Sequence, residues 1–341
     1  MKRLIPCLLL LCLVLAGCGE EAPPQAKHYT ATFLTLFDTV TTIIGPGESE
    51  AAFQAQAQQL HDQLEHYHQL FDIYHSYEGI ANLKTVNDQA GIAPVQVDNA
   101  IIRLLTDCKE YYRLTGGKVN VALGSVLSLW HEARSDGIRD PLNAALPDPA
   151  ALNEAADHGD INCLIIDPEA STVYLTDSKM KLDVGAIAKG WACQRVAETA
   201  PTGMLISVGG NVCATGPKTE AGDPWIIGIQ DPDQASSNLH TLYVPQGSVV
   251  TSGDYQRSYT VDGKAYHHII DPATQMPGTL WRSVSVVCSD SALADALSTA
   301  LFLLPLEEGM ALANARGVQV LWLDHQGQEY MTLEFQSLIR T

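Results

Sequence analysis

The chain has 341 residues and carries 20 Lys and Arg against 39 Asp and Glu, which gives a formal net charge of −19. This length exceeds a typical single core, so one large domain or two closely joined domains are expected. The acidic balance disfavours nucleic acid and anionic lipid headgroups as ligands, because both would be repelled.

The first residues predict export and lipidation. A basic start is followed by an apolar run over residues 4–16 that is short for a membrane span, and small residues stand just before Cys18. We expect a lipoprotein signal peptide over residues 1–17, then a lipidated Cys18 with a flexible tether over residues 18–28, on the extracytoplasmic face of the cell membrane. An ordinary signal peptide with an incidental cysteine is the alternative.

Residues 29–341 are expected to form the folded domain. A strand is predicted over residues 30–44, followed by a helix over residues 48–71 that is capped by Ser49. The spacing of apolar residues predicts a second helix over residues 99–114, before a glycine pair. Residues 136–149 are polar and marked by proline, which indicates a surface loop.

From residue 163 onward the pattern changes to strands separated by two helices. We predict strands over residues 163–167, 172–175, 204–208, 226–230, 240–244, 249–252, 258–261, 283–288, 318–323 and 329–334. The helices are expected over residues 186–200 and 291–304. This order indicates an α+β or mixed α/β fold.

Five cysteines follow Cys18, without the spacing of a zinc site. They stand within apolar stretches, so buried free thiols are expected rather than a disulfide framework. The five tryptophans are interpreted as core or rim residues.

A strand that ends at Asp183 is followed by Gly185 and the start of a helix. Backbone N–H groups at such a helix start favour phosphate oxygens, and Lys189 adds a positive charge one turn later. Asp183 can accept a hydrogen bond from a ribose hydroxyl or organise the turn. Alternatively, the junction binds nothing and Asp183 caps the helix.

The predicted helix 291–304 carries a carboxylate and a hydroxyl on an otherwise apolar surface. Asp295 and Thr299 are four residues apart and share a face with Ser291, and Ser289 is expected to cap the helix. Oxygen ligands of this kind suit Mg²⁺, with water, a backbone carbonyl and substrate phosphates completing the site. A buried Asp hydrogen-bonded to Thr is the alternative.

Paired histidines precede the Asp271-Pro272 dipeptide, which is expected to start a turn. If His267 and His268 lie on a strand, they point to opposite faces and only one can face a site. An imidazole with a neighbouring acid suits general-base work on a hydroxyl near neutral pH. A structural histidine is the alternative.

Together, these segments resemble the FAD:protein FMN transferases of the ApbE family over about residues 37–304. The matching pieces are residues 37–39, 116–120, 183–190, 206–211, 251–255, 268–272 and 295–299. The resemblance implies two closely packed lobes with a ligand cleft between them. It also implies Mg²⁺-dependent transfer of FMN from FAD to a Ser or Thr hydroxyl of an acceptor protein, with release of AMP.

The resemblance also assigns roles to single residues. Asp295, Thr299 and the carbonyl of Ala186 would bind Mg²⁺, and His268 would activate the acceptor hydroxyl. The expected FAD contacts are Phe37, Tyr74, Lys118, Val119, Asn120, Asp183, Lys189 and Ile269. The acceptor would be a membrane-associated redox protein with an exposed Ser/Thr flavinylation site.

Three positions depart from the family pattern. Phe37 replaces a usual methionine, Asn120 replaces a common aspartate, and Gln275 stands where a glycine is usual. The last change lies near His268 and is expected to affect acceptor choice.

Two other functions remain open at this point. Attack by water instead of a protein hydroxyl would make the protein an FAD pyrophosphatase that yields FMN and AMP. A lipid-anchored flavin-binding protein without chemistry would share the anchor and the acidic surface.

Overall fold

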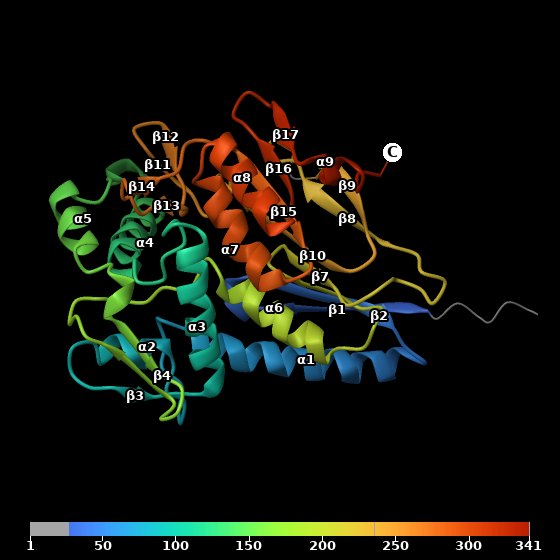
Figure 1. Ribbon diagram of the computed structural model, residues 1–341, viewed down its shortest axis with the longest axis horizontal. Helices are drawn as coiled ribbons and strands as arrows, with labels where there is room; N and C mark the ends of the chain where they lie inside the picture. Colours follow the sequence, from blue (N-terminus) through green and yellow to red (C-terminus); the bar gives the residue numbers. More distant parts are fainter. Residues whose placement is uncertain (1–26, 235, 341) are drawn as a thin grey trace, which may run out of the picture.

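The larger lobe is built on an eight-stranded antiparallel sheet, which a computed structural model shows together with the rest of residues 27–234 and 236–340 (Figure 1). The strand order is β1-β2-β6-β7-β10-β15-β16-β17. These strands are β1 (His28–Leu34), β2 (Val40–Pro46), β6 (Leu205–Val208), β7 (Asn211–Ala214), β10 (Gly247–Gly253), β15 (Ser283–Cys288), β16 (Gln319–Leu323) and β17 (Glu329–Met331). The signal peptide, Cys18 and nearly all of the predicted tether lie outside the described residues.

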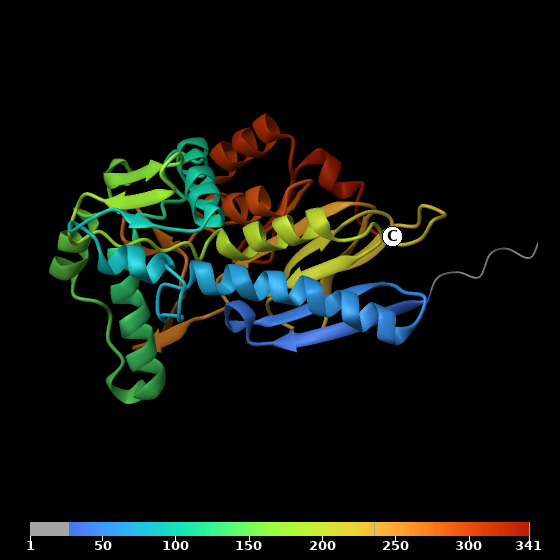
Figure 2. The same ribbon diagram turned by 90° about the horizontal axis from the view of Figure 1, so that it is seen from below.

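Helices cover one face of this sheet, and a hairpin covers part of the other. The helices are α1 (Glu50–Phe71), α6 (Ala188–Thr199), α7 (Ser291–Phe302) and α8 (Leu306–Arg316). Both views show α1 and α6 side by side against the sheet (Figures 1 and 2), and their apolar residues share one core with β2 and β6. The hairpin β8 (Trp225–Gln230) and β9 (Asn238–Val244) packs with α9 (Leu333–Gln336) on the opposite face.

Strand β15 shows why elements pack on both faces of this sheet. All six of its residues are buried. Val284 and Val286 pack in the core that contains α7, whereas Val287 packs in the core that contains β8 and β9. Because side chains alternate between the faces of a strand, a continuous apolar run requires apolar neighbours on both sides.

The smaller lobe contains most of the remaining helices, a three-stranded sheet and two short hairpins. Its elements are α2 (Leu83–Asp88), α3 (Asn99–Leu114), α4 (Gly124–Arg139), α5 (Pro149–Ala156), β3 (Val95–Gln96), β4 (Leu164–Asp167), β5 (Thr172–Leu175), β11 (Tyr259–Val261), β12 (Lys264–Tyr266), β13 (Ile270–Asp271) and β14 (Met276–Pro277). One core joins α3 of this lobe to Trp191 of α6 and to Ala292, Ala296 and Ala300 of α7. The two lobes are therefore closely packed, and the predicted mixed α/β class is confirmed.

The structure corrects several predicted boundaries. The strand expected over residues 30–44 is a hairpin, because Thr35, Phe37 and Asp38 adopt positive φ angles between β1 and β2. Helix α4, which the sequence did not reveal, extends to Arg139, so the predicted loop begins four residues later. Residues 329–334 are not one strand, since β17 ends at Met331 and α9 follows.

Other local predictions are confirmed. Ser49 caps α1 by accepting from the N–H of Ala52, and α3 ends at Leu114 before the glycine pair. All five cysteines in the described residues are free, and four of them are buried; Cys163 is partly exposed. The five tryptophans are at most 5% exposed.

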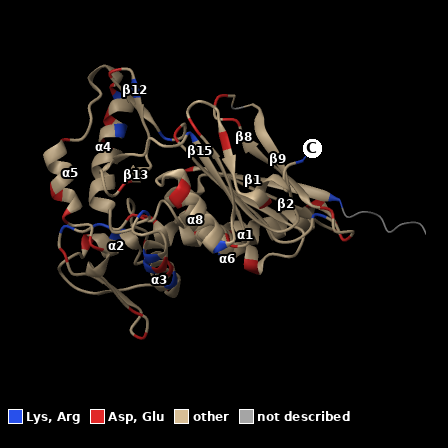
Figure 3. Cartoon of the chain, turned by 45° about the horizontal axis from the view of Figure 1, so that its top comes forward, with Lys and Arg blue, Asp and Glu red and all other residues tan. Residues whose placement is uncertain are grey.

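Charge is distributed broadly over the molecule. Figure 3 shows acidic positions on both lobes, with basic positions interspersed among them. No helix in the described part of the chain is both long enough and apolar enough to cross a membrane.

Candidate active site

A close contact between α6 and α7 brings Asp295 to the start of α6. The Asp295 Oδ2 atom accepts a hydrogen bond of 2.8 Å from the N–H of Gly190 and lies 3.8 Å from the Nζ atom of Lys189. A Cβ atom at Gly190 would lie 2.5 Å from the Cβ of Asp295 and would also clash with the carbonyl of Ser291. Glycine is therefore required where the two helices meet.

This contact gives a testable prediction. Gly190→Ala is expected to lower the free energy of unfolding by about 1–3 kcal/mol, because the methyl group would push α6 away from α7. It should also displace Asp295 from the N–H of Gly190, since Asp295 would move with α7. Urea unfolding measures the first effect, and wild-type stability in the variant would contradict the close packing.

The surroundings of Asp295 suit a divalent metal. The residue is 4% exposed, and burial raises the pKa of its carboxyl group despite the opposing effects of Lys189 and the Gly190 N–H. Because Lys189 and the Gly190 N–H offset only part of the negative charge of this buried carboxylate, a bound cation would stabilise it. Asp290, rather than Ser289, caps α7, and its side chain accepts from the N–H of Leu293.

Further oxygen atoms lie on the same side of α7. Thr299, one turn after Asp295, is partly exposed, and Ser291, one turn before it, has a buried hydroxyl without a hydrogen-bond partner among the described residues. Ala186 lies in the turn before α6, four residues ahead of the Gly190 N–H that binds Asp295. Hydroxyl, carboxylate and carbonyl oxygens form a donor set that fits Mg²⁺.

Asp183 organises the turn that leads into α6. Its Oδ1 atom accepts a hydrogen bond of 2.8 Å from the N–H of Gly185, two residues later, so it does not cap α6 itself, which begins at Ala188. Burial raises the pKa of this carboxyl group. Lys189 Nζ lies 3.4 Å from the carbonyl of Gly185, so the ammonium group lies over the turn that Asp183 stabilises.

The two histidines do not lie on a strand, because residues 267 and 268 fall between β12 and β13. His267 is structural: it is buried, donates to the carbonyl of Gly278 and accepts from the N–H of Ile269. His268 is exposed, and its Nδ1 atom donates to the carbonyl of Gln256 at 3.2 Å. This bond leaves the Nε2 atom free to accept a proton.

The pKa of His268 is lowered from its ordinary value to about 3. The protein atoms packed around the imidazole remove part of its hydration and are the largest cause, although the residue still reaches the surface; the nearby charges of Arg257 and Lys189 contribute next. The imidazole is therefore neutral at physiological pH, which is the form that a general base requires.

Phe37 and Tyr74 lie at the same junction, on segments that flank α1. Phe37 adopts φ 52°, and its N–H donates to the Nδ1 atom of His68 at 3.3 Å. Tyr74 is 50% exposed, and its ring stacks on His131 of α4 with a centroid distance of 5.1 Å. An exposed aromatic ring on this stack can contact a flat ligand.

The predicted Lys118–Asn120 segment has mainly structural contacts. Lys118 forms an ion pair of 3.0 Å with Asp271, and the Val119 side chain is buried in the core. Asn120 donates to the carbonyl of Gly159 and accepts from the N–H of Ala122. An aspartate could not make the first of these bonds, which explains why an amide suits this position.

The remaining predicted contact, Ile269, is also part of the interior. Its side chain is 6% exposed and packs in the core that contains α7. Its carbonyl accepts from the N–H of Gly278, so this residue fixes the backbone next to His268.

Gln275 lies in the turn after Asp271 and adopts φ 59°, a conformation that favours glycine. We expect Gln275→Gly to raise the free energy of unfolding by about 1 kcal/mol, because the left-handed backbone penalises a side chain. Gln275→Ala is the matched control, since alanine keeps the strain. Equal stabilities of the two variants in urea would contradict this explanation.

Two cationic residues at the junction were missed by sequence reasoning. Arg257 follows β10, and its Nη2 atom donates to the carbonyl of Phe37 at 3.3 Å. Arg134 on α4 lies 3.1 Å from the Nδ1 atom of His131. No local motif marks either residue, because each joins the site only through the packing of distant segments.

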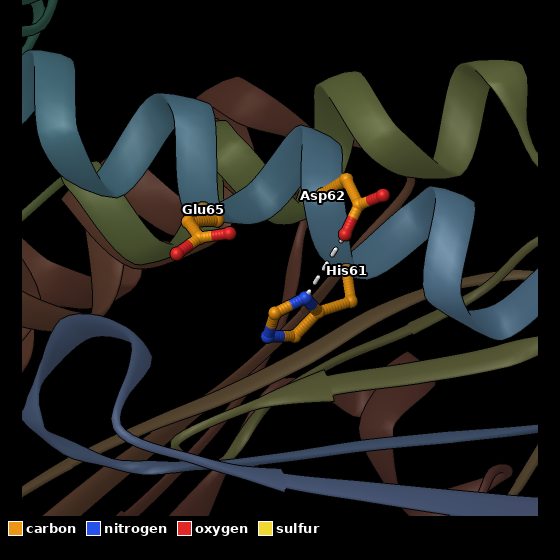
Figure 4. A group of neighbouring side chains, drawn as sticks. All are labelled: His61, Asp62 and Glu65. Carbon is orange, nitrogen blue, oxygen red and sulfur yellow. Dashed lines mark hydrogen bonds and ion pairs between the residues drawn. The ribbon is translucent and has the colours of Figure 1, made fainter.

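A separate group of possible metal ligands lies on α1. His61, Asp62 and Glu65 have ligand atoms within 4.8 Å of one another (Figure 4). Asp62 is largely exposed, and His61 Nδ1 already contacts Gln58 and Asp62. This group is distinct from the site around Asp295, and we assign no metal to it.

Comparison with known proteins gives consistent matches. The sequence model of the ApbE family matches residues 34–322. An FAD:protein FMN transferase of Treponema pallidum is 37% identical over 262 residues, which cover 71% of this chain and 70% of that protein. One from Vibrio cholerae is 27% identical and covers 96% of both chains. The crystal structure of the ApbE protein of Thermotoga maritima superposes with a TM-score of 0.82 at 26% identity, covering 92% of this chain and all of that one.

Proposed function

The chain belongs to the ApbE family, and from that premise we propose that it transfers FMN from FAD to a Ser or Thr hydroxyl of an acceptor protein, with Mg²⁺ as cofactor and AMP as the second product. The family assignment makes the chain an enzyme of the FAD:protein FMN transferase type and agrees with the resemblance found in the sequence. The metal, the acceptor hydroxyl and the leaving group are the parts added by this proposal.

The observation that supports the proposal best is the convergence of three distant segments. Asp295 lies 3.8 Å from Lys189, and Lys189 lies close enough to His268 to lower its pKa. A buried carboxylate for a metal, an ammonium group for phosphate and a neutral imidazole are thus combined. Attack on a pyrophosphate requires these three functions, because charge must be neutralised and the nucleophile must lose a proton.

Each residue then has a defined task. Asp295, Thr299 and the Ala186 carbonyl would hold Mg²⁺, which, when bound, neutralises charge on the phosphate oxygens of FAD. Asp183 keeps the turn before α6 in shape, and Lys189 contributes its positive charge there. The Nε2 atom of His268 accepts the proton of the acceptor hydroxyl, while Nδ1 holds the ring in position through Gln256.

The flavin end is assigned by the same reasoning. We propose that Phe37 and the exposed ring of Tyr74 contact the isoalloxazine. Lys118, Val119, Asn120 and Ile269 would contribute through backbone atoms or by supporting neighbours, because their side chains are buried or already bonded.

The proposal also includes a location. We propose that Cys18 carries lipid and that the enzyme acts on the extracytoplasmic face of the membrane, where its acceptor would be a membrane-associated redox protein. The support is the basic, apolar and small-residue order that ends at Cys18. Mass spectrometry of the mature protein tests this, because an unmodified Cys18 in the native host would contradict it.

One experiment tests the reaction. The purified protein is incubated with FAD and an acceptor domain that carries a Ser/Thr flavinylation motif, with either Mg²⁺ or a chelator. We expect the acceptor to gain the mass of one FMN group only when Mg²⁺ is present, with one AMP released per acceptor modified. An unmodified acceptor and intact FAD would contradict the proposal.

The same experiment addresses the second candidate function. Because His268 reaches the surface, water can take the place of the acceptor hydroxyl and give FAD pyrophosphatase activity. Free FMN and AMP formed equally fast without an acceptor would favour this activity. The third possibility, a flavin-binding protein without chemistry, is disfavoured because the curated relatives are transferases.

A further inference from the structure

Two arginines at the lobe junction lack acidic partners. Arg134 lies on α4 and is partly buried, and Arg257 lies in the connection between β10 and β11. Within the described part of the chain, neither guanidinium forms an ion pair with a carboxylate. The arginines therefore have positive charge available for an anionic ligand.

The two guanidinium groups also act on one another. Burial is the main reason why the pKa of Arg134 is lowered, and the charge of Arg257 is the next cause. Arg257 likewise contributes to the lowered pKa of His268. Like charges raise one another's free energy, and an anion that binds near both would lower it.

Hydrogen bonds define where such an anion would lie. Arg257 donates to the carbonyl of Phe37, and the preceding residue, Gln256, accepts from His268. Arg134 contacts His131, whose ring stacks on Tyr74. Arg257 thus lies between Phe37 and His268, and Arg134 lies next to the aromatic stack that contains Tyr74.

We propose that Arg134 and Arg257 bind the flavin-side phosphate of FAD, whose phosphorus receives the acceptor oxygen. This inference rests on the proposed function. In FAD this phosphate joins the flavin to AMP, so it must lie between the flavin contacts and the base. The acceptor oxygen forms a bond to this phosphorus, the bond from phosphorus to the bridging oxygen breaks, and AMP leaves with the electron pair of that bond. The acceptor proton passes to His268, and the guanidinium groups stabilise the negative charge on the phosphoryl oxygens.

The test compares two ligands that differ by this phosphate alone. Affinities of the full chain for FMN and riboflavin are measured by flavin fluorescence, without Mg²⁺. We expect the wild-type protein to bind FMN more tightly than riboflavin, and Arg134→Gln and Arg257→Gln each to reduce this ratio by about 10-fold or more, as for a lost charge-assisted hydrogen bond.

Matched variants separate this effect from damage to the fold. Arg139→Gln is the control, since Arg139 lies on the same helix, is exposed and pairs only with Asp136 on the surface. The ratio of FMN affinity to riboflavin affinity in Arg139→Gln should equal that of the wild type. Arg257→Lys keeps the charge and should retain part of the discrimination, and thermal unfolding identifies any variant that is misfolded.

Several outcomes would overturn the inference. The first is a wild-type protein that binds FMN no more tightly than riboflavin. The second is a ratio of FMN to riboflavin affinity that is unchanged in both glutamine variants. If that ratio is unchanged but the KM for the acceptor rises, the arginines bind an acidic segment of the acceptor instead. If the wild type transfers FMN but the ratio is unchanged in the variants, only this inference fails. If the wild type neither binds FAD nor transfers FMN, the proposed function itself fails.

Discussion

Asp295→Asn is expected to lower Mg²⁺-dependent FMN transfer by about 10³-fold or more, because the variant loses the one buried carboxylate proposed to bind the metal. The amide has nearly the same shape and can still accept the hydrogen bond from the N–H of Gly190. The fold should therefore persist. Initial rates of acceptor labelling, measured over a range of Mg²⁺ concentrations, give the size of the loss.

A second readout for this variant does not depend on activity. Burial raises the pKa of Asp295, so the folded state favours the protonated carboxyl group. The stability that this protonated form contributes is lost as pH rises through the raised pKa. Without metal, Asp295→Asn should thus melt at the same temperature as the wild type or higher at neutral pH. Added Mg²⁺ should raise the melting temperature of the wild type but not that of the variant.

The control lies on the same helix. Asp290 caps α7 through its side chain, and asparagine is an equally good capping residue. Asp290→Asn should therefore keep both activity and the stabilisation by Mg²⁺. Full activity in Asp295→Asn, or Mg²⁺ stabilisation equal to that of the wild type, would refute the assignment of Asp295 as a metal ligand.

His268→Gln is expected to lower the transfer rate by about 10²–10⁴-fold, which is the usual contribution of a general base. FAD affinity should change little, because the proposed flavin and metal contacts remain. His267→Gln provides the contrast: His267 bonds Gly278 and Ile269, so its loss should reduce stability rather than the chemical step. Single-turnover labelling of the acceptor and equilibrium binding of FAD separate the two effects.

The pH dependence supplies an independent check on His268. Protonation removes the base, so activity should fall as pH falls through the pKa of His268. Since this pKa is lowered to about 3, kcat/KM for FAD, which reports the free enzyme, should not decline near pH 6.5. The fall of kcat at low pH should occur at a higher pH than the fall of kcat/KM, because the negative diphosphate of bound FAD offsets the positive charges of Arg257 and Lys189. A decline of kcat/KM near pH 6.5 that disappears in His268→Gln would contradict the lowered pKa.

The departures from the family pattern have local explanations. Asn120 uses both ends of its amide to hold the backbone of the smaller lobe. Gln275 occupies a left-handed position, and its turn is held by the indole N–H of Trp130, which donates to the Gln275 carbonyl at 2.8 Å. Both substitutions therefore change the support of the site without removing a proposed metal ligand.

The sequence by itself determined the helices α1 and α3, most strands after residue 163 and the α/β class. It also determined the facing pair of Asp295 and Thr299 and the resemblance to the ApbE family. These features depend on residues a few positions apart, since capping and apolar periodicity act within a turn or a strand.

Only the tertiary structure decided the rest. The hairpin turn at Phe37, the separate roles of His267 and His268 and the contact of Arg257 with the Phe37 carbonyl depend on contacts between segments far apart in the chain. Gly190 illustrates the reason, because its need for glycine comes from α7, about a hundred residues later. Packing between lobes decides which polar groups lose water and which charges lie close together, and local sequence patterns carry no such information.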